Sequence, residues 1–163
     1  MGASLDGIKA VFLDLDGTIY LGGNLIPGAL EFLHRCDEQG VQRFFLSNNS
    51  SRSVTQYVKK LEGMGIPATA DDVLLSTHDC LAWLKKNNVT KTYCVGTEGM
   101  CKMLEAEGIA TRSLKPQYVV LGYDTETTYE KLETASLHLH AGVPLMASHP
   151  DMVCPSPDGG LPD

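Results

Sequence analysis

The stretch AVFLDLDGTIYLGG, residues 10–23, decides the fold. An apolar run over residues 8–13 predicts a strand buried on both faces, and Asp14 and Asp16 follow it with one leucine between them. Residues i and i+2 of a strand point to the same side, so we expect the two carboxylates to face together and Leu15 to turn into the core. Paired carboxylates repel each other unless a cation or a shared proton lies between them. Their hard oxygen atoms suit Mg²⁺, which takes part of its shell from phosphate, so the stretch predicts a site for phosphate chemistry.

The rest of the chain predicts the α/β class, a parallel sheet covered by helices, because strand-like and helix-like patterns alternate. Further strands are expected over 41–47, 73–76, 91–96, 118–122 and 143–148, and helices over 27–40, 54–61, around 81–84, around 100–104 and over 127–140. The pattern pauses at Asn87 and Asn88. We therefore expect two domains, residues 1–88 and residues 89–163.

A second polar cluster, SNNSSR over residues 47–52, follows the second expected strand. Ligands of parallel α/β sheets bind beyond the carboxyl ends of the strands, so this cluster and the Asp14–Asp16 pair are expected to share one crevice. Taken alone, Asp-x-Asp is an ordinary turn and Ser-Asn-Asn an ordinary helix-capping loop. Their combination after two apolar strands favours a functional site.

Composition excludes several classes of protein. The formal charge of -7 and the absence of a basic stripe argue against a nucleic-acid-binding surface. No run of about 18 apolar residues occurs, and no secretory signal is recognisable, so we expect a soluble, cytoplasmic protein. Five cysteines without a Cys-x-x-Cys pair are expected to be reduced thiols, with Cys94 and Cys101 in the core.

Two strings, FLDLDGTIY and FLSNNSS, resemble the haloacid dehalogenase-like hydrolase superfamily, and in particular its p-nitrophenylphosphatase-like branch. Three later segments are similar to the α/β cap of that branch: VGTEGM, YVVLGYDTETTYEKL and ASHPDMVCPSPDGG. The resemblance implies a Rossmann-like core, represented by residues 1–88 with the first two family motifs, and a type IIA cap over residues 89–163. It also implies a Mg²⁺-dependent phosphatase of small phosphorylated metabolites.

The resemblance further implies roles for individual residues. Asp14 would be the nucleophile that forms an aspartyl-phosphate, and Asp16 would protonate the leaving oxygen and then activate water. Ser47 and the backbone donors of Asn48 and Asn49 would bind the transferring phosphoryl group. Mg²⁺ would bind the Asp14 side chain and the Asp16 backbone carbonyl. Residues 18–26 would form a mobile flap beside the site.

Two further motifs of the family have no counterpart in the sequence: a lysine beside the nucleophile, and a Gly-Asp-x-x-x-Thr-Asp string that completes the metal shell. The lysines considered for the first of these stand in other contexts: Lys85, Lys86, Lys91, Lys102, Lys115 and Lys131. Loss of one preorganised donor costs about a hundred- to a thousandfold in rate, so we expect the chain alone to be nearly inactive. Without the later strands of the family sheet, residues 8–13 are expected to form an exposed apolar edge.

These gaps leave alternatives open. We expect the chain to be a truncated or incomplete gene product, or half of something that pairs. It could be a non-catalytic remnant that serves as a phosphate-binding or dimerising module, for example a homodimer through the cap. A metal-dependent glycosyltransferase with an Asp-x-Asp motif is a weaker alternative, because the pair stands where a nucleophile would, at the end of the first strand.

Overall fold

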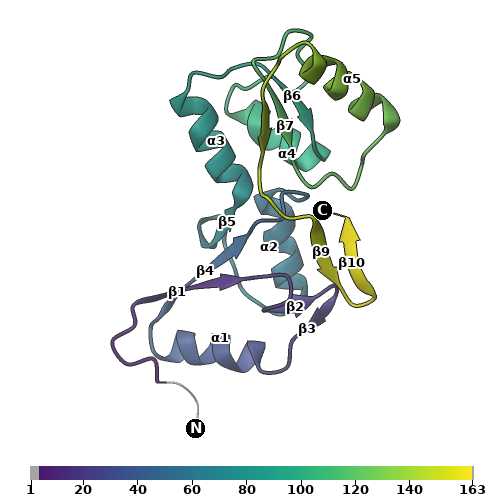
Figure 1. Cartoon of the computed structure of the whole chain (residues 1–163). Coiled ribbons are helices and arrows are strands. Elements are labelled where there is room, and N and C mark those ends of the chain that lie inside the picture. The colour runs from purple at the N-terminus through teal and green to yellow at the C-terminus, as the bar shows by residue number, and fades with distance from the viewer. Residues whose placement is uncertain (1–3, 163) are drawn as a thin grey trace. The chain divides into compact units, whose positions relative to one another are not determined.

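The computed structural model describes residues 4–162. They form two compact units (Figure 1). The first unit consists of residues 4–47, 54–74 and 153–162, and the second of residues 48–53 and 75–152. Each unit is an α/β structure around its own parallel sheet, in agreement with the fold class expected from the sequence.

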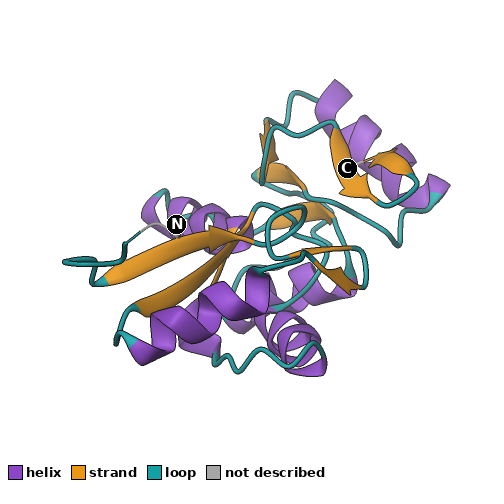
Figure 2. Ribbon diagram, turned by 90° about the horizontal axis from the view of Figure 1, so that it is seen from below, coloured by secondary structure: helices purple, strands orange, loops and turns teal. Residues whose placement is uncertain are grey.

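The sheet of the first unit has the strand order β1-β4-β5. Strand β1 (Ala10–Asp14) runs parallel to β4 (Gln42–Ser47), with Ala10 opposite Gln42 and Asp14 opposite Leu46 (Figure 2). The other elements of this unit are the helices α1 (Ala29–Glu38) and α2 (Val54–Gly63), a short 3₁₀ turn (Ala70–Asp72) and β5 (Val73–Leu75). The helices bury the apolar positions that their 3.6-residue periodicity predicts, among them Leu33 of α1 and Leu61 of α2.

Strand β1 is not buried on both faces, which corrects the expectation drawn from its apolar run. Phe12 is 62% exposed and Ile8, just before the strand, is 42% exposed. The physical reason is that β1 is an edge strand, paired only with β4 among residues 4–162. The exposed Phe12 ring stacks on Phe44 of the neighbouring strand, with ring centroids 5.2 Å apart.

Two small hairpins complete the first unit. Strands β2 (Tyr20–Leu21) and β3 (Asn24–Leu25) lie within the segment expected to be a flap. Strands β9 (Val153–Ser156) and β10 (Gly159–Pro162) pair in the last described segment. The second hairpin was not expected from the sequence.

The second unit has three layers. Its parallel sheet, in the order β6-β7-β8, comprises β6 (Thr92–Val95), β7 (Tyr118–Leu121) and β8 (Leu145–Ala147). Its helices are α3 (Ser76–Lys86), α4 (Glu98–Ala106) and α5 (Tyr129–His140). Cys94 of β6 packs in one core with residues of α3 and α4, whereas Tyr93 and Val95 pack with Ala135 of α5. Successive strand residues thus contact helices on opposite faces, which explains the continuous apolar runs of β6 and β7.

The division into units differs from the domain boundary expected near residue 88. Helix α3 groups with the second unit because it buries Cys80, Leu81 and Leu84 in the same core as α4. Residues 153–162 group with the first unit. The compact units are defined by packing. The domain boundary at residue 88 refers to the core and cap of the family, and it remains a prediction.

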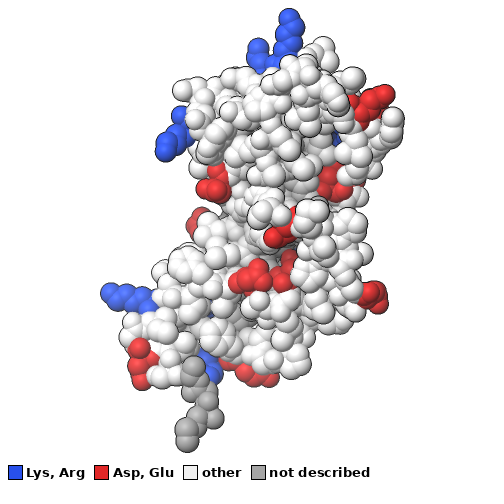
Figure 3. Space-filling model, in the orientation of Figure 1, with Lys and Arg blue, Asp and Glu red and all other residues white. Residues whose placement is uncertain are grey.

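The surface carries scattered charges. On the face shown in Figure 3, Lys and Arg side chains are spread over the surface and do not gather in one basic patch. Among the helices of residues 4–162, none is both long and apolar enough to cross a membrane.

Candidate functional site

A tight turn follows β1 and separates the two aspartates. The Leu15 side chain is fully buried, as the sequence predicts. Its carbonyl oxygen accepts hydrogen bonds from the backbone N–H groups of Thr18, Ile19 and Tyr20 at 3.2, 3.0 and 3.2 Å. Gly17 adopts a φ of 88° and its N–H donates to the Tyr20 carbonyl oxygen at 2.7 Å. Only glycine takes this backbone conformation without a steric penalty, so Gly17 allows the chain to turn out of the strand.

Asp14 is the last residue of β1, and its side chain is exposed. The Thr18 hydroxyl donates a hydrogen bond to Asp14 Oδ2 at 3.0 Å. Because Asp14 lies opposite Leu46 in the β1–β4 register, Ser47 is the next residue beyond that pair. The carboxylate and the Ser47 hydroxyl therefore end neighbouring parallel strands at the same edge of the sheet, as the sequence predicts.

The Asp16 carboxylate group is contacted by side chains from the turn after β1 and from α2. Tyr20 Oη donates to Asp16 Oδ2 at 3.5 Å, and Lys60 Nζ lies 3.8 Å from Asp16 Oδ1. The Lys60 ammonium also lies 3.6 Å from the centroid of the Tyr20 ring. The Asp16 and Lys60 side chains are each only 19% exposed, so this ion pair is largely shielded from water.

Lys60 is a residue that the sequence reasoning missed. It lies on α2, one residue before the fully buried Leu61 and three residues after the buried Tyr57. A lysine three positions from a buried tyrosine lies near the packed face of the helix. That spacing is the sequence signal for a lysine turned toward the core, although it does not identify Asp16 as the partner.

Ser47 is 5% exposed, and its hydroxyl lies 3.2 Å from Tyr57 Oη on α2, where either oxygen can donate. Helix α2 therefore supplies a neighbour to each of two candidate residues: Tyr57 to Ser47 and Lys60 to Asp16.

Asn48 and Asn49 belong to the second unit, where both side chains and the Asn48 carbonyl oxygen are hydrogen-bonded. The Asn48 amide donates to Asp151 Oδ2, and the Asn48 carbonyl oxygen accepts from Ser76 Oγ at 2.8 Å. Asn49 Oδ1 accepts from both the backbone N–H and the hydroxyl of Ser51, at 2.9 and 2.6 Å. Both asparagine side chains thus stabilise the loop over residues 48–53, and the role expected for these residues depends on their backbone groups.

A metal ion at the strand ends would have few protein side chains as ligands. Among residues 4–162, no three His, Cys, Asp or Glu side chains gather in a way that could hold a metal ion. The exposed Asp14 carboxylate offers hard oxygen donors, which fits Mg²⁺ because this ion commonly uses one or two carboxylates, several waters and substrate phosphate. The chemistry of the donor set is therefore compatible with the expected cofactor.

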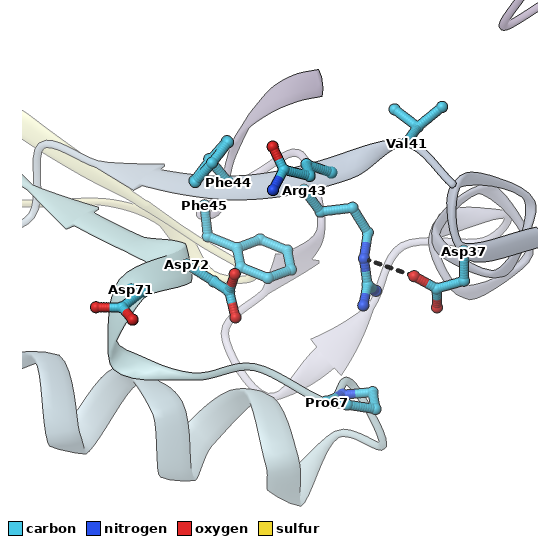
Figure 4. A pocket seen from close by; sticks show the side chains of 9 residues that line it. Asp37, Val41, Arg43, Phe44, Phe45, Pro67, Asp71 and Asp72 are labelled. Carbon is cyan, nitrogen blue, oxygen red and sulfur yellow. Dashed lines mark ion pairs between the residues drawn. The ribbon is translucent and has the colours of Figure 1, made fainter. Parts of the chain in front are cut away.

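A separate cavity of about 280 Å³ lies in the first unit, away from these residues along β4 (Figure 4). It is lined by the first residues of β4, by Asp37 of α1, and by Pro67, Asp71 and Asp72. Arg43 in its wall forms an ion pair with Asp37, with Nε and Oδ1 3.0 Å apart. Since β4 runs from Gln42 to Ser47, the cavity is at the opposite end of the strand from Ser47 and is not part of the candidate site.

Comparisons with known proteins identify the family of the chain. The sequence pattern of a family described as haloacid dehalogenase-like hydrolase matches residues 11–110. The chain is 34% identical over 156 residues to an acid sugar phosphatase of Staphylococcus saprophyticus; the match covers 94% of this chain and 60% of that protein. The chain thus spans less than two thirds of the length of this relative.

Solved structures show the same similarity. A 4-nitrophenylphosphatase from Thermotoga maritima superposes with a TM-score of 0.89 at 39% identity, covering 98% of this chain and 61% of the other. A glycerol phosphate phosphatase from Mycobacterium tuberculosis, solved in complex with magnesium, superposes with a TM-score of 0.85 at 28% identity, covering 95% of this chain and 48% of the other. The chain therefore belongs to the haloacid dehalogenase-like hydrolases, in their p-nitrophenylphosphatase-like branch.

Proposed function

We propose that the chain carries the nucleophile half of a Mg²⁺-dependent phosphatase that hydrolyses small phosphomonoesters through an aspartyl-phosphate. The observation that carries this proposal is the placement of Asp14 and Ser47 at the ends of adjacent parallel strands, with Asp16 held beside Lys60 and Tyr20 just after the first strand. The names of the relatives support the phosphatase class. Because those names differ in substrate, we assign a phosphate ester and no particular metabolite.

The proposed chemistry has two steps. In the first, a carboxylate oxygen of Asp14 attacks phosphorus while the bond from phosphorus to the ester oxygen breaks, and Asp16 gives that oxygen a proton. In the second, Asp16 takes a proton from the water that attacks the aspartyl-phosphate, which frees phosphate and restores Asp14. The Thr18 hydroxyl donates a hydrogen bond to Asp14 Oδ2. Because Oδ2 is engaged in this way, we assign the attack on phosphorus to Oδ1.

Other groups of the chain would bind the phosphoryl group. The Ser47 hydroxyl, at the end of β4, is proposed to donate to a phosphoryl oxygen, and the backbone N–H groups of Asn48 and Asn49 remain candidates for the same role. Mg²⁺, when bound by the Asp14 carboxylate and the Asp16 backbone carbonyl, would neutralise charge on the transferring group. We further propose that the 163-residue chain turns over slowly, because the family's lysine and final metal-binding motifs have no counterpart in its sequence.

A binding assay tests the proposal independently of turnover. Beryllium fluoride mimics a phosphoryl group on a carboxylate, so with Mg²⁺ it should raise the melting temperature of the chain, since a ligand that binds only the folded state stabilises it. The rise should disappear in Asp14→Asn and persist in Asp158→Asn, a matched change at an exposed aspartate of the same unit. An equal rise in Asp14→Asn would overturn the assignment of the nucleophile.

Turnover itself is measured with p-nitrophenyl phosphate and Mg²⁺. We expect a rate close to that of the Asp14→Asn variant. An ordinary enzymatic rate that this substitution abolishes would support the nucleophile and refute the proposed impairment.

A dimerising module is the second candidate function, and one observation favours it. Helix α5 exposes large apolar side chains, with Tyr129 80% and Leu137 67% exposed. Pairing of two copies through the second unit would cover them. Light scattering of the purified chain tests this candidate: a monomer at high micromolar concentration would exclude it, and a dimer lost in Leu137→Lys would support it.

A further inference from the structure

The loop over residues 48–53 lies against one end of the sheet of the second unit, to which it belongs. Strands β6, β7 and β8 are parallel, so the residues that follow them share one edge of this sheet. One residue after each strand donates a hydrogen bond to the loop: Thr97 after β6, Tyr123 after β7 and Ser148 after β8. Parallel α/β sheets commonly bind ligands at this edge, and here a loop of the chain itself is bound there.

Ser50 is the centre of these contacts and is fully buried. Its Oγ accepts a hydrogen bond from the backbone N–H of Tyr123 at 2.8 Å and another from the Ser148 hydroxyl at 3.1 Å. The carbonyl oxygen of the next residue, Ser51, accepts from the Thr97 hydroxyl at 3.0 Å. Three donors at the strand ends therefore hold two successive residues of the loop.

The close approach of Ser50 to the sheet depends on Gly122, the first residue after β7. A Cβ atom at position 122 would lie 2.7 Å from Ser50 Oγ, and closer still to Met100 Sδ. Such contacts are too short for any residue with a side chain, so a larger residue would push the loop away from the strand ends. The absence of a side chain at Gly122 thus allows Ser50 to reach the Tyr123 N–H.

Ser50 directly follows Asn48 and Asn49, whose backbone N–H groups are the proposed candidates for phosphoryl binding. On the other side of these two residues, Ser76 Oγ donates to the Asn48 carbonyl oxygen at 2.8 Å. The backbone donors therefore lie between two attachment points on the second unit, Ser76 before them and Ser50 after them. Donors stabilise a developing charge best when their positions are fixed in advance, and these two attachments would supply that rigidity.

We propose that Ser50 is a positioning residue for phosphoryl binding: Tyr123 and Ser148 hold its hydroxyl, and it in turn fixes the backbone N–H groups of Asn48 and Asn49. The inference rests on the proposed function, because that function places the phosphoryl group at this loop. Loss of the Ser50 hydroxyl would remove the acceptor that both donors share. The loop would then gain conformational freedom, and its N–H groups would occupy the binding arrangement for less of the time.

Isothermal titration calorimetry with beryllium fluoride and Mg²⁺ tests the role of Ser50. Ser50→Ala should weaken binding by at least about tenfold relative to the unmodified chain. The matched control is Thr92→Val, which removes a fully buried hydroxyl that donates to the Ala110 carbonyl oxygen at 2.9 Å, at the opposite end of β6 from the loop. The control should lower the melting temperature and leave the affinity unchanged. Equal affinity of Ser50→Ala and the unmodified chain would overturn the proposal.

A milder pair of variants decides the proposal even if Ser50→Ala fails to fold. Ser148 is only partly buried, so Ser148→Ala removes one donor to Ser50 and keeps the bond from the Tyr123 N–H. Binding of beryllium fluoride should weaken by a smaller factor than in Ser50→Ala. Ser148→Thr keeps the hydroxyl and should restore the affinity. An unchanged affinity in Ser148→Ala, or an equal loss in Ser148→Thr, would contradict the proposal.

Amide hydrogen exchange without any ligand follows the loop itself. Ser50→Ala should speed the exchange of residues 48–53 by at least about tenfold, and Thr92→Val should leave it unchanged. Faster exchange with unaltered affinity would make Ser50 a structural residue only and would refute the positioning role. If the unmodified chain binds no beryllium fluoride, the proposed function fails and this inference fails with it. If that chain binds and Ser50→Ala binds equally well, the inference alone fails.

Discussion

Lys60 Nζ lies 3.8 Å from Asp16 Oδ1 while it also covers the face of the Tyr20 ring. The ammonium is thus shared between a carboxylate and an aromatic ring, and Tyr20 in turn donates its hydroxyl to the same carboxylate. Lys60 and Tyr20 fix the position of Asp16, the residue proposed to move protons. Lys60 acts here as a positioning residue, and we do not assign it the role of the family's missing lysine.

The first prediction concerns the energetic coupling between Lys60 and Asp16. Lys60→Met should lower the free energy of unfolding by about 1 kcal/mol, because a shielded ion pair and a cation–π contact are lost together. In a double-mutant cycle with Asp16→Asn, urea unfolding should give a coupling of about 0.5–1 kcal/mol. The control is Lys59→Met on the same helix, for which no coupling to Asp16 is expected. A coupling of zero for Lys60 would show that its contact with Asp16 does not stabilise the fold.

The second prediction concerns the backbone of the turn after β1. Gly17→Ala should destabilise the chain by about 1–2 kcal/mol, because its φ of 88° disfavours any residue with a Cβ atom. Steric overlap is not the cause, since no atom lies within 4 Å of the position of an added Cβ. Gly23→Ala, which has equally open space without a positive φ, should change stability far less. Thermal unfolding of the two variants compares them, and equal effects would contradict the strain argument.

A third prediction contrasts two phenylalanines on adjacent strands. Phe45 of β4 is 1% exposed, so Phe45→Ala should lower the free energy of unfolding by about 3–5 kcal/mol. Phe12 of β1 is 62% exposed, so Phe12→Ala should cost much less and should reduce self-association through the apolar edge. Urea unfolding and light scattering measure the two effects. A similar loss of stability for both variants would mean that Phe12 is covered in solution.

The fourth prediction concerns alkaline pH. The Cys80 thiol has its pKa raised from 9.0 to about 11, mainly by burial and further by Asp79. The unfolded chain therefore loses this proton at lower pH than the folded chain, and stability falls as pH rises from about 9 to 11. Cys80→Ala should remove up to about 2 kcal/mol of that fall. The measurement is the difference in urea midpoint between pH 8 and pH 10.5 for both chains, and an identical fall in the variant would contradict a shifted Cys80.

Much of this fold could be predicted from the sequence, because hydrophobic periodicity is a local signal. Leu33 and Leu61 belong to apolar patterns with helical spacing, which predict α1 and α2. The continuous apolar run of β6 predicts a strand covered on both faces. The β9–β10 hairpin was missed because Pro155 and Pro162 lie within its strands and the segment alternates poorly. Proline is expected in such edge strands, but its presence hides them in a sequence.

The candidate site was predictable where its residues end strands and unpredictable where partners come from elsewhere. Asp14 and Ser47 could be placed because parallel register brings strand ends together. Lys60 could not, since its contact with Asp16 depends on how α2 packs, which no spacing along the chain encodes.

The fully buried Leu15, with three backbone N–H groups on its carbonyl oxygen, has a consequence for protein engineering. The residue between the two aspartates takes no part in the proposed chemistry, yet its burial sets where the flanking residues leave the sheet. A design that places the Asp14–Asp16 pair on another scaffold would therefore need a buried apolar pocket for the intervening side chain. Without that pocket, two carboxylates at the same sequence spacing would share the motif of this protein but not its geometry.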